Sequence, residues 1–426
     1  MGNVLDVLKE RGFVQQVTDE AAVREALDRD SVTCYIGFDP TAESLHVGSL
    51  LPIMALAHML RHGHNPIAIL GGGTALVGDP SGKTEMRQML SHEQIEENGK
   101  GLQAQLQHYL TWNGRSASVI DNFQWLGKLR YIDFLRDIGR HFSVNRMLAM
   151  EAYKIRLEAG LSFIEFNYQL LQAYDYLVLF CDHGCTLQMG GDDQWGNILA
   201  GVDLVRRVKG ATVQGLTFPL ITTASGEKMG KTASGAIWLD KEKTSPYDFF
   251  QYWVNTDDKD VLRFLAYFTF LPMSEVRRVG DLRDAELNAA KTMLAYEVTK
   301  ERHGEEEARR ALSAAQQVFG SRDLPEHILP SSTIPRRTDA KESADVPTST
   351  IDQARMDAGI LAVDLFCEVG LSPSKGQARR LIQQGGLYVN DKRIEDIGHT
   401  VSSSDLVDGV LMLRSGKKRY HRVVVA

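Results

Sequence analysis

The sequence predicts an α/β protein with a parallel-sheet domain, then an α-helical domain and a small α+β domain. Up to about residue 235, short apolar strand candidates alternate with helical patterns, which is typical of a parallel sheet. Past residue 245 the strand candidates stop and helical patterns follow one another. The last part of the chain combines a basic helix with a hairpin pattern. We therefore predict domains at 1–235, 236–323 and 351–426, with a linker at 324–350.

The elements of the first domain follow from its hydrophobic pattern. Residues 1–30 have the spaced apolar positions of amphipathic helices. Ile67-Ala68-Ile69-Leu70 is a fully apolar run followed by three glycines, as in a buried parallel strand and its loop. In such a sheet, ligands bind at the carboxyl ends of the strands. The predicted strands are 34–38, 67–70, 118–120 and 186–189, and the predicted helices are 47–62, 92–111, 129–140 and 164–181.

A helix-start signal opens the second domain. Ser245 is a good N-cap, Pro246 suits the first helical position, and Asp248 suits the third. Helices are expected over most of 247–318. The segment 324–350 is rich in Pro, Ser, Thr and charge and poor in apolar residues, which predicts a linker.

The tail is basic although the chain as a whole is acidic. Residues 351–426 hold 11 Lys and Arg against 9 Asp and Glu. Ser374 opens a predicted helix that Gly385 stops, and the hairpin pairs 411–414 with 420–423. Cations of the helix and of the hairpin turn can form one face for RNA phosphates, although a solvated cationic helix has the same composition. The predicted RNA-binding residues are Lys375, Arg379, Arg380, Lys417 and Lys418.

The composition excludes several classes of protein. A formal net charge of −7 argues against a general nucleic-acid coat but leaves room for a local basic patch. The four cysteines fit a reducing compartment. Cys181 and Cys185 have no second ligand pair close by, so a structural role is favoured over zinc and no metal site is predicted. The start resembles no signal peptide and no run approaches a membrane span, so we expect a cytoplasmic protein with no membrane partner.

The most informative stretch lies around His46. A strand candidate, the break Asp39-Pro40-Thr41 and a predicted helix follow one another. His46, Gly48 and Ser49 therefore stand at a helix N-terminus, where free N–H groups and the positive end of the helix dipole favour a phosphate. Taken alone, an ordinary helix-start histidine is an equally good interpretation.

A second phosphate-binding candidate is the loop over residues 226–235. It is rich in Gly, Ser and Thr, cannot pack a core, and carries Lys228 and Lys231. Two ammonium groups on such a loop can close over a polyphosphate and stabilise the charge that grows as pyrophosphate leaves. A solvated basic loop is the alternative. Both motifs in this order, one domain apart, are much harder to obtain by chance than either alone.

Two other nucleotide-binding motifs are excluded because the spacing of their glycines does not match the sequence. The segment 78–84 is similar to a P-loop, and P-loop enzymes are the main rival class. Val77, however, occupies the position of the first glycine of that motif. A β-branched residue there would obstruct the tight turn around the phosphate. Gly71-Gly72-Gly73 fails the dinucleotide fingerprint because Leu76 occupies its last glycine position.

A polar stripe on the predicted helix 164–181 indicates a ligand pocket. Tyr168, Gln172 and Asp175 are spaced i, i+4, i+7, so they project from one face. A buried polar stripe without partners is unfavourable, so the stripe either faces solvent or lines a pocket. The Gly-rich polar turn 188–197 suits close approach of a nucleoside, and a magnesium site or an exposed turn are the alternatives.

Together these motifs resemble class I aminoacyl-tRNA synthetases, and in particular the bacterial-type tyrosyl-tRNA synthetase family. His46-Val47-Gly48-Ser49 resembles the HIGH signature, and Lys228-Met229-Gly230-Lys231-Thr232 resembles the KMSKS signature. The tail resembles, chiefly through residues 374–382, a small RNA-binding fold named after a ribosomal small-subunit protein. The resemblance covers nearly the whole chain. It implies a Rossmann-like catalytic domain, an α-helical anticodon-side domain and a C-terminal RNA-binding domain.

The resemblance also implies a role for each matching residue. The expected tyrosine-binding residues are Tyr35 and Asp175 at the phenol, Asp79, Tyr168 and Gln172 at the ammonium group, and Gln194 near the carboxylate. The expected ATP-binding residues are Gly37, Asp39, His46, Gly48, Ser49, Gly191, Asp193 and Lys231. The residues expected to act on the phosphates are Thr41, His46, Lys83, Arg87, Lys228, Lys231 and Thr232.

The implied reaction activates L-tyrosine with ATP and transfers it to the 3′-terminal ribose of tRNA(Tyr). Mg²⁺ is expected with ATP, no tightly bound cofactor is expected, and the family is homodimeric, with residues 134–161 as the expected contact. Ser49 and Ile36 depart from the commonest family pattern and are expected to alter ATP handling at most. A non-catalytic RNA-binding protein on the same scaffold is the alternative, disfavoured because the phosphate-binding lysines and the tyrosine-binding residues are intact.

Overall fold

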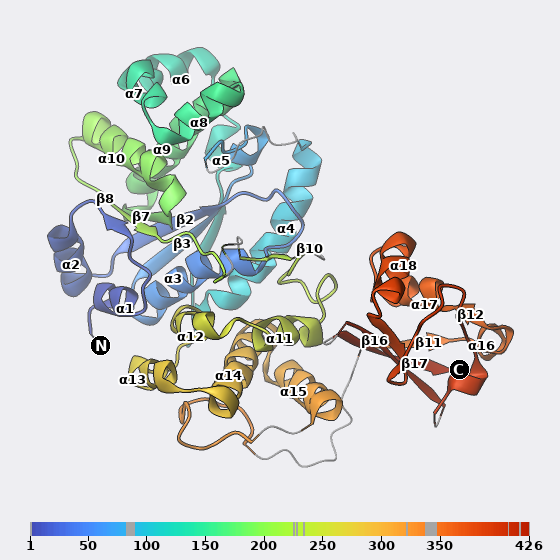
Figure 1. The fold of residues 1–426 in the computed structure, drawn as a ribbon. Helices are drawn as coiled ribbons and strands as arrows, with labels where there is room; N and C mark the ends of the chain where they lie inside the picture. Colours follow the sequence, from blue (N-terminus) through green and yellow to red (C-terminus); the bar gives the residue numbers. More distant parts are fainter. Residues whose placement is uncertain are drawn as a thin grey trace. The chain divides into compact units, whose positions relative to one another are not determined.

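The computed structural model describes residues 2–81, 90–224, 226, 229–232, 235–320, 323–336, 347–407, 409–416 and 419–425. These residues divide into two compact units (Figure 1). The first comprises residues 1–230, 238–240 and 262–277, and the second comprises 231–237, 241–261 and 278–426.

A six-stranded sheet forms the centre of the first unit, in the order β1-β8-β7-β2-β3-β6. All neighbours are parallel except β1, which pairs antiparallel with β8 at the edge. The strands are β1 Gln16–Val17, β2 Thr33–Phe38, β3 Asn65–Leu70, β6 Ser118–Asp121, β7 Cys185–Gly191 and β8 Gln214–Phe218. The four predicted strands are confirmed. β8 and β1 were not predicted, because β8 is interrupted by glycine and threonine and β1 has two residues.

Helices cover both faces of this sheet (Figure 1). One face packs Tyr35, Ile67 and Ile69 against α9 and α10 in a buried cluster. Successive strand residues point to opposite faces, and α3, buried along nearly its whole length, packs on the other face of β2 and β3. The main helices are α1 Val4–Glu10, α2 Glu20–Arg29, α3 Leu50–Arg61, α4 His92–Tyr109, α9 Phe163–His183 and α10 Trp195–Lys209.

Shorter elements connect these layers. Between β6 and α9 lie α5 Phe123–Leu126, α6 Tyr131–Asp137, α7 Val144–Leu148 and α8 Glu151–Ala159. Single 3₁₀ turns are η1 Val47–Ser49, η2 Thr74–Leu76, η3 Gly139–His141 and η4 Asp192–Gln194, and a small hairpin joins β4 Thr111–Trp112 to β5 Arg115–Ser116. The predicted helix 47–62 is therefore η1 followed by α3. Among the described residues, every helix is too short or too polar to span a bilayer.

Part of the predicted second domain returns to the first unit. Residues 262–277, with most of α12 Val261–Phe268 and with α13 Met273–Val276, belong to the unit that contains the sheet. The buried guanidinium of Arg11 donates to the carbonyl oxygens of Ala266, Thr269 and Leu271 at 2.6–2.9 Å. The N-terminal helix α1, which ends beside Arg11, is thus tied to this returning segment.

The helical part of the second unit contains α11 Pro246–Val254, α14 Asp284–His303 and α15 Glu305–Phe319. Ser245 caps α11 through the N–H of Asp248, and Pro246 is its first residue, so the predicted helix start is confirmed. Residues 324–336 lie in the predicted linker but are packed into the fold, since Leu324, Ile328, Leu329 and Ile334 are all buried. Their apolar side chains were outweighed in the prediction by the surrounding Pro and Ser residues.

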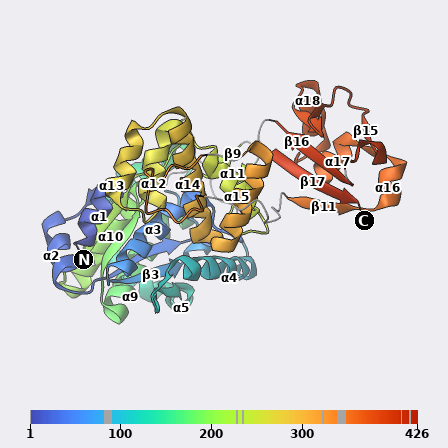
Figure 2. The ribbon, with the colours of Figure 1, turned by 90° about the horizontal axis from the view of Figure 1, so that it is seen from below.

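The tail folds as a small sheet with helices (Figure 2). Its strand order is β11-β17-β16-β13-β14, and β11 runs parallel to β17. The predicted basic helix and late hairpin are confirmed. The tail's elements are β11 Thr348–Ile351, α16 Gln353–Ala358, β12 Ile360–Leu361, α17 Ala362–Glu368, α18 Lys375–Gln383, β13 Leu387–Val389, β14 Lys392–Arg393, β15 Thr400–Val401, β16 Val410–Ser415 and β17 Arg419–Val425.

Candidate active site

A cavity of about 370 Å³ opens at the carboxyl ends of β2, β3 and β7. This is the position where ligands bind in parallel α/β sheets. All six residues expected to bind tyrosine line it, and so do most of those expected at the nucleotide. The predicted residues that line this cavity are Tyr35, Gly37, Asp39, Thr41, Gly48, Ser49, Asp79, Tyr168, Gln172, Asp175, Gly191, Asp193 and Gln194.

At one end of the cavity, Tyr35 and Asp175 are buried together. The Tyr35 hydroxyl is inaccessible and has no hydrogen-bond partner among the described residues. Burial raises the pKa of Tyr35 well above its usual value, and the nearby Asp175 adds to this effect. An unpaired buried hydroxyl is unfavourable, so this end of the cavity is suited to a ligand that supplies a polar partner.

The carboxylate of Asp175 is held by two donors. Trp125 Nε1 donates to Oδ1 at 2.7 Å, and Asn122 Nδ2 donates to Oδ2 at 3.0 Å. Burial raises the pKa of Asp175 to about 7, and these two hydrogen bonds act in the opposite direction. A carboxylate has about four acceptor sites, so each oxygen can still accept a hydrogen bond from a ligand hydroxyl.

A chain of hydrogen bonds leads from Asp175 across the floor of the cavity. Asn122 Nδ2 also donates to Thr74 Oγ1 at 3.1 Å, and Thr74 Oγ1 donates to Asp39 Oδ1 at 2.8 Å. The other oxygen of Asp39 accepts from the Tyr168 hydroxyl at 3.2 Å. Asn122 and Thr74 are almost fully buried, so this network orders the side chains between the two ends of the cavity.

The triple glycine after β3 makes room for this network. A Cβ atom on Gly71 would overlap Asp39 Oδ1 and Thr74 Oγ1, and one on Gly72 would overlap the carboxylate of Asp121. Gly71 and Gly72 therefore let two carboxylates pack closely against the backbone. The sequence did not indicate Thr74 as a cavity residue, whereas the buried Gln188 belongs to the polar turn predicted to face a nucleoside.

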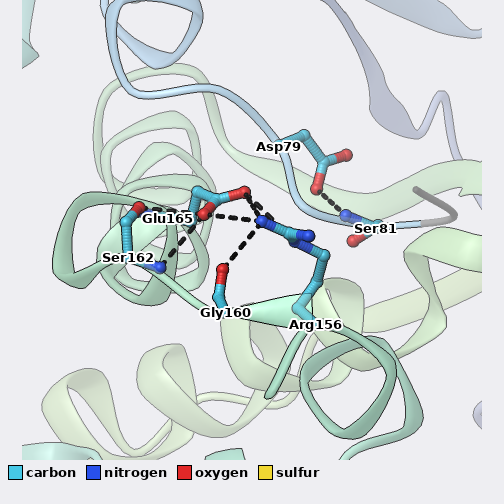
Figure 3. A network of polar contacts seen from close by, with 6 residues as sticks. All are labelled: Asp79, Ser81, Arg156, Gly160, Ser162 and Glu165. Atoms are coloured by element: carbon cyan, nitrogen blue, oxygen red, sulfur yellow. Dashed lines mark hydrogen bonds and ion pairs between the residues drawn. The ribbon is translucent and has the colours of Figure 1, made fainter. Parts of the chain in front are cut away.

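Polar groups also converge around Asp79. Gln194 Nε2 donates to Asp79 Oδ2 at 2.7 Å, and the backbone N–H of Ser81 donates to Oδ1 at 2.9 Å (Figure 3). Asn197 Nδ2 donates to Gln194 Oε1 at 3.1 Å and fixes the orientation of that amide. Asp79 is thus a positioned acceptor that faces the cavity next to Gln172 and Tyr168.

A buried ion pair fixes the start of α9, which carries the polar stripe. Arg156 Nη2 lies 3.1 Å from Glu165 Oε1, and both side chains are at most 4% exposed (Figure 3). Arg156 also donates to the carbonyl of Gly160, and Ser162 and Glu165 form a capping box. Burial alone would raise the pKa of Glu165, but the hydrogen bonds from Arg156 and Ser162 outweigh it and lower the pKa. Tyr168 therefore projects from a helix whose first turn is rigidly held.

The histidine motif lies directly against the Met229-Gly230 backbone. His46 caps η1 by accepting the Gly48 N–H at Nδ1, 3.0 Å away, which assigns the ring proton to Nε2 as a donor. A Cβ on Gly48 would lie 2.8 Å from the Met229 carbonyl oxygen, and one on Gly230 would lie 2.9 Å from His46 Nδ1. The two glycines let the two predicted phosphate-binding motifs touch.

Several predicted phosphate-binding residues cannot be placed. Lys83, Arg87 and Lys228 lie outside the described residues. The backbone of Lys231–Thr232 forms β9, which pairs with β10, Gly235–Ala236, but the side chains of β9 also lie outside the description.

The basic residues of the tail are partly described. Lys375, Arg379 and Arg380 are exposed on α18, where Lys375 also pairs with Asp364 at 2.9 Å. Lys417 and Lys418 lie outside the described residues. On the sheet, Arg414 stacks over the Tyr388 ring at 3.6 Å from its centre, a contact that the sequence did not predict.

Two family models match the chain. Residues 27–320 match the model described as "tRNA synthetases class I (W and Y)". Residues 340–423 match the model described as "Tyrosine--tRNA ligase SYY-like C-terminal domain". Both parts of the chain are thus similar to parts of one kind of enzyme.

Similar proteins span the whole chain. It is 60% identical to a tyrosine–tRNA ligase of Desulfosudis oleivorans over 99% of both chains, and 57% identical to one of Desulfatibacillum aliphaticivorans over 100% of this chain and 99% of the relative. A C-terminally truncated mitochondrial tyrosyl-tRNA synthetase of Aspergillus nidulans has a similar structure, with a TM-score of 0.68 and 33% identity. That similarity covers 75% of this chain and 95% of the truncated enzyme.

Proposed function

The chain belongs to the tyrosine–tRNA ligases of the class I tRNA synthetase family, and we propose that the cavity at the end of β2, β3 and β7 is where it joins L-tyrosine to ATP. Tyrosyl-adenylate and pyrophosphate are the products of that step. The tyrosyl group then passes to the 3′-terminal ribose of tRNA(Tyr). The observation that carries the placement is the unpaired Tyr35 hydroxyl beside the Asp175 carboxylate.

The substrate tyrosine lies with its phenol between Tyr35 and Asp175. Its hydroxyl donates to Asp175 and accepts from Tyr35, which gives each buried group a partner. The ammonium group binds Asp79, Tyr168 and Gln172, where the Asp79 carboxylate supplies a charge-assisted hydrogen bond. Gln194, which donates to Asp79, also lies next to the substrate carboxylate.

ATP occupies the other side of the cavity, above Gly37 and Asp39 and beside the turn that holds Gly191 and Asp193. The tyrosine carboxylate attacks the α-phosphorus in line, and pyrophosphate leaves. No side-chain nucleophile is needed, so catalysis is positioning and stabilisation of phosphate charge. His46 Nε2–H is a donor for that charge, together with Thr41, Lys83, Arg87, Lys228, Lys231 and Thr232.

Mg²⁺ enters with ATP in this proposal. The ion keeps several waters and binds phosphate oxygens with one or two carboxylates. Among the described residues no group of three or more His, Cys, Asp or Glu side chains could hold a metal ion, so the phosphates of ATP would supply most of its ligands. When bound, the ion neutralises charge on the phosphates.

The proposed tRNA contacts lie in the second unit and the tail. The helical part, residues 236–323, would contact the anticodon side, and the tail, 351–426, would bind RNA phosphates through Lys375, Arg379 and Arg380, joined by Lys417 and Lys418. We also propose a cytoplasmic location, since the relatives that match over the whole chain are bacterial tyrosine–tRNA ligases.

We also propose a homodimer that uses the expected stretch 134–161 and its flanks. This part of the described chain exposes an unusual number of large apolar side chains, which is a feature of protein interfaces. The residues are Tyr131, Ile132, Val144, Leu157 and Phe163, between 48% and 70% exposed. A second copy of this chain covers them in the proposed dimer.

The activation step is tested by amino-acid-dependent exchange of pyrophosphate into ATP. Each of the twenty amino acids is offered in turn, and exchange is expected with tyrosine alone. Charging of tRNA(Tyr) with labelled tyrosine tests the second step. Exchange that is absent with tyrosine, or faster with tryptophan, contradicts the proposal.

A further inference from the structure

Side chains at the edge of the sheet form hydrogen bonds to η4, the turn that is proposed to contact the nucleotide. Asp192 is the first residue of η4, and its Oδ1 accepts hydrogen bonds from Gln16 Nε2 at 2.7 Å and Thr217 Oγ1 at 2.8 Å. Gln16 lies on β1 and Thr217 on β8, and the two residues are direct partners in the antiparallel ladder. One oxygen atom therefore connects the η4 turn to two neighbouring strands.

The η4 turn carries two residues of the cavity. Asp193 and Gln194 line it, whereas Asp192, Gln16 and Thr217 do not. Gln194 also holds Asp79 by the 2.7 Å hydrogen bond. The residue before η4 is Gly191, which has no side chain with which to cap the turn. Asp192 thus supplies a side-chain restraint at the beginning of the turn.

The hydrogen bonds to Asp192 restrain the η4 turn strongly because their acceptor is a carboxylate. Hydrogen bonds to a carboxylate are shorter and stronger than those between neutral groups. Thr217 is fully buried, so its hydroxyl would lose its partner if the carboxylate were removed. Gln16 and Thr217 are held by the β1–β8 ladder, with the further backbone hydrogen bond from Gln15 N to Thr217 O at 2.8 Å.

We propose that Asp192 is a positioning residue for amino-acid activation. Through Gln16 and Thr217 it fixes the turn that presents Asp193 to the nucleotide and Gln194 to Asp79. The edge strand β1, neither of whose residues lines the cavity, thereby acts on the active site. This inference rests on the proposed function.

Three variants test it by tyrosine-dependent pyrophosphate exchange. Asp192→Ala is expected to raise KM for ATP about tenfold with a smaller change in kcat, because the binding turn is displaced. Asp192→Asn keeps an oxygen acceptor at the same place and is expected to stay close to the unmodified enzyme. Gln16→Leu removes one donor and is expected to give an intermediate KM. The double variant Asp192→Ala with Gln16→Leu is expected to match Asp192→Ala, because the contact is shared.

The matched control is Gln15→Leu, at the exposed neighbouring glutamine whose side chain points to the other face of the strand. It is expected to leave KM for ATP unchanged. The thermal unfolding midpoint of each variant is measured alongside. Should Asp192→Ala fail to fold, the KM for ATP of Gln16→Leu tests the inference: an increase supports it, and an unchanged KM overturns it.

An Asp192→Ala enzyme with a lower midpoint and unchanged KM would make the contact structural only and overturn the inference. An Asp192→Asn enzyme as impaired as Asp192→Ala would do so too. Both results leave the proposed function standing. Absence of tyrosine-dependent exchange in the unmodified enzyme overturns that function as well.

Discussion

The proposed selectivity for tyrosine depends on the buried carboxylate of Asp175. Its two oxygens each accept one hydrogen bond from the protein, and the hydroxyl of its neighbour Tyr35 has no partner in the part of the chain that the structure describes. Phenylalanine in this cavity would leave both groups without the hydroxyl they need. Enzymes of this class are known to reject phenylalanine by about 10⁵-fold on this principle, a value established for them and taken over as such.

Tyr35→Phe is expected to reduce the preference for tyrosine over phenylalanine about tenfold. The variant loses one hydrogen bond to the hydroxyl of tyrosine. Phenylalanine binds it without leaving the hydroxyl of residue 35 buried and unpaired, because that hydroxyl has been removed. The measurement is kcat/KM for pyrophosphate exchange with each amino acid. Tyr176→Phe is the control, since the Tyr176 hydroxyl donates to the carbonyl of Gln214 at 2.7 Å and does not line the cavity. An unchanged preference in Tyr35→Phe, or an equal loss in the control, would contradict the site.

The raised pKa of Asp175 predicts a pH dependence of stability. Its pKa rises from 3.8 to about 7 on folding, so the folded state holds this proton more tightly than the unfolded chain does. The stability from this group is therefore complete below pH 3.8 and is lost as the pH rises through 7. Asp175→Asn cannot ionise and lacks this dependence.

Between pH 5 and 8, the unfolding free energy of the unmodified protein is expected to fall relative to that of Asp175→Asn by about 2 kcal/mol. Urea unfolding of both proteins at several pH values and one protein concentration measures the difference. Parallel pH profiles would show that Asp175 ionises as easily in the folded protein as in the unfolded chain.

Among the elements, η1 lies against the backbone of Met229 and Gly230, so parts of the two predicted phosphate-binding motifs are in contact. This contact depends on glycines, because a Cβ on Gly48 would lie 2.7 Å from His46 Cε1 and 2.8 Å from the Met229 carbonyl oxygen. Atoms at such distances must move apart. The close approach of Met229 and Gly230 to His46 therefore requires that residues 48 and 230 have no side chain.

Gly48→Ala is expected to slow adenylate formation by about 10- to 100-fold with little change in tyrosine affinity, because it shifts groups at the phosphates and not at the phenol. Stopped-flow measurement gives the rate, and equilibrium dialysis gives the tyrosine Kd. The control is Gly99→Ala on α4, where an added Cβ meets nothing within 4 Å. A weakened tyrosine Kd with an unchanged rate would contradict this assignment.

At the scale of the molecule, activation and tRNA charging are expected to be separable. The tail has its own core, and the truncated Aspergillus nidulans enzyme, similar over 75% of this chain, was crystallised without its C-terminal part. Since β11 pairs with β17, the cut belongs before residue 347. Deletion of 347–426 is expected to leave pyrophosphate exchange intact and to lower charging of tRNA(Tyr) about tenfold or more, since it removes phosphate-binding cations. Unaffected charging would show that the tail does not bind the tRNA.

The proposed dimer gives a second prediction at this scale. Ile132 is 70% exposed, and an aspartate there would be buried without a partner in the dimer. Ile132→Asp is expected to sediment as a monomer, whereas Val407→Asp, at a residue 61% exposed in the tail, is expected to remain dimeric. A monomeric unmodified protein, or a dimer that tolerates Ile132→Asp, would exclude this interface.

Most of the main strands and helices could be predicted because they have strong local patterns. The run at Ile67, the cap at Ser245 and the polar stripe from Tyr168 to Asp175 each depend on residues close in sequence. β8 and the buried segment 323–336 were missed because their environment comes from distant residues. Thr74 was missed for the same reason, since its partners Asp39 and Asn122 lie 35 and 48 residues away.

The sequence alone determined four of the six strands of the large sheet, its main helices, the two predicted phosphate-binding motifs and the family resemblance, because periodicity, caps and short motifs are local properties. Only the tertiary structure decided that Tyr35 and Asp175 share one end of a cavity and that Asp192 joins Gln16 to Thr217. These residues come from segments far apart in the chain. Their meeting depends on how the sheet pairs and how α9 packs on it, which no short stretch of sequence specifies.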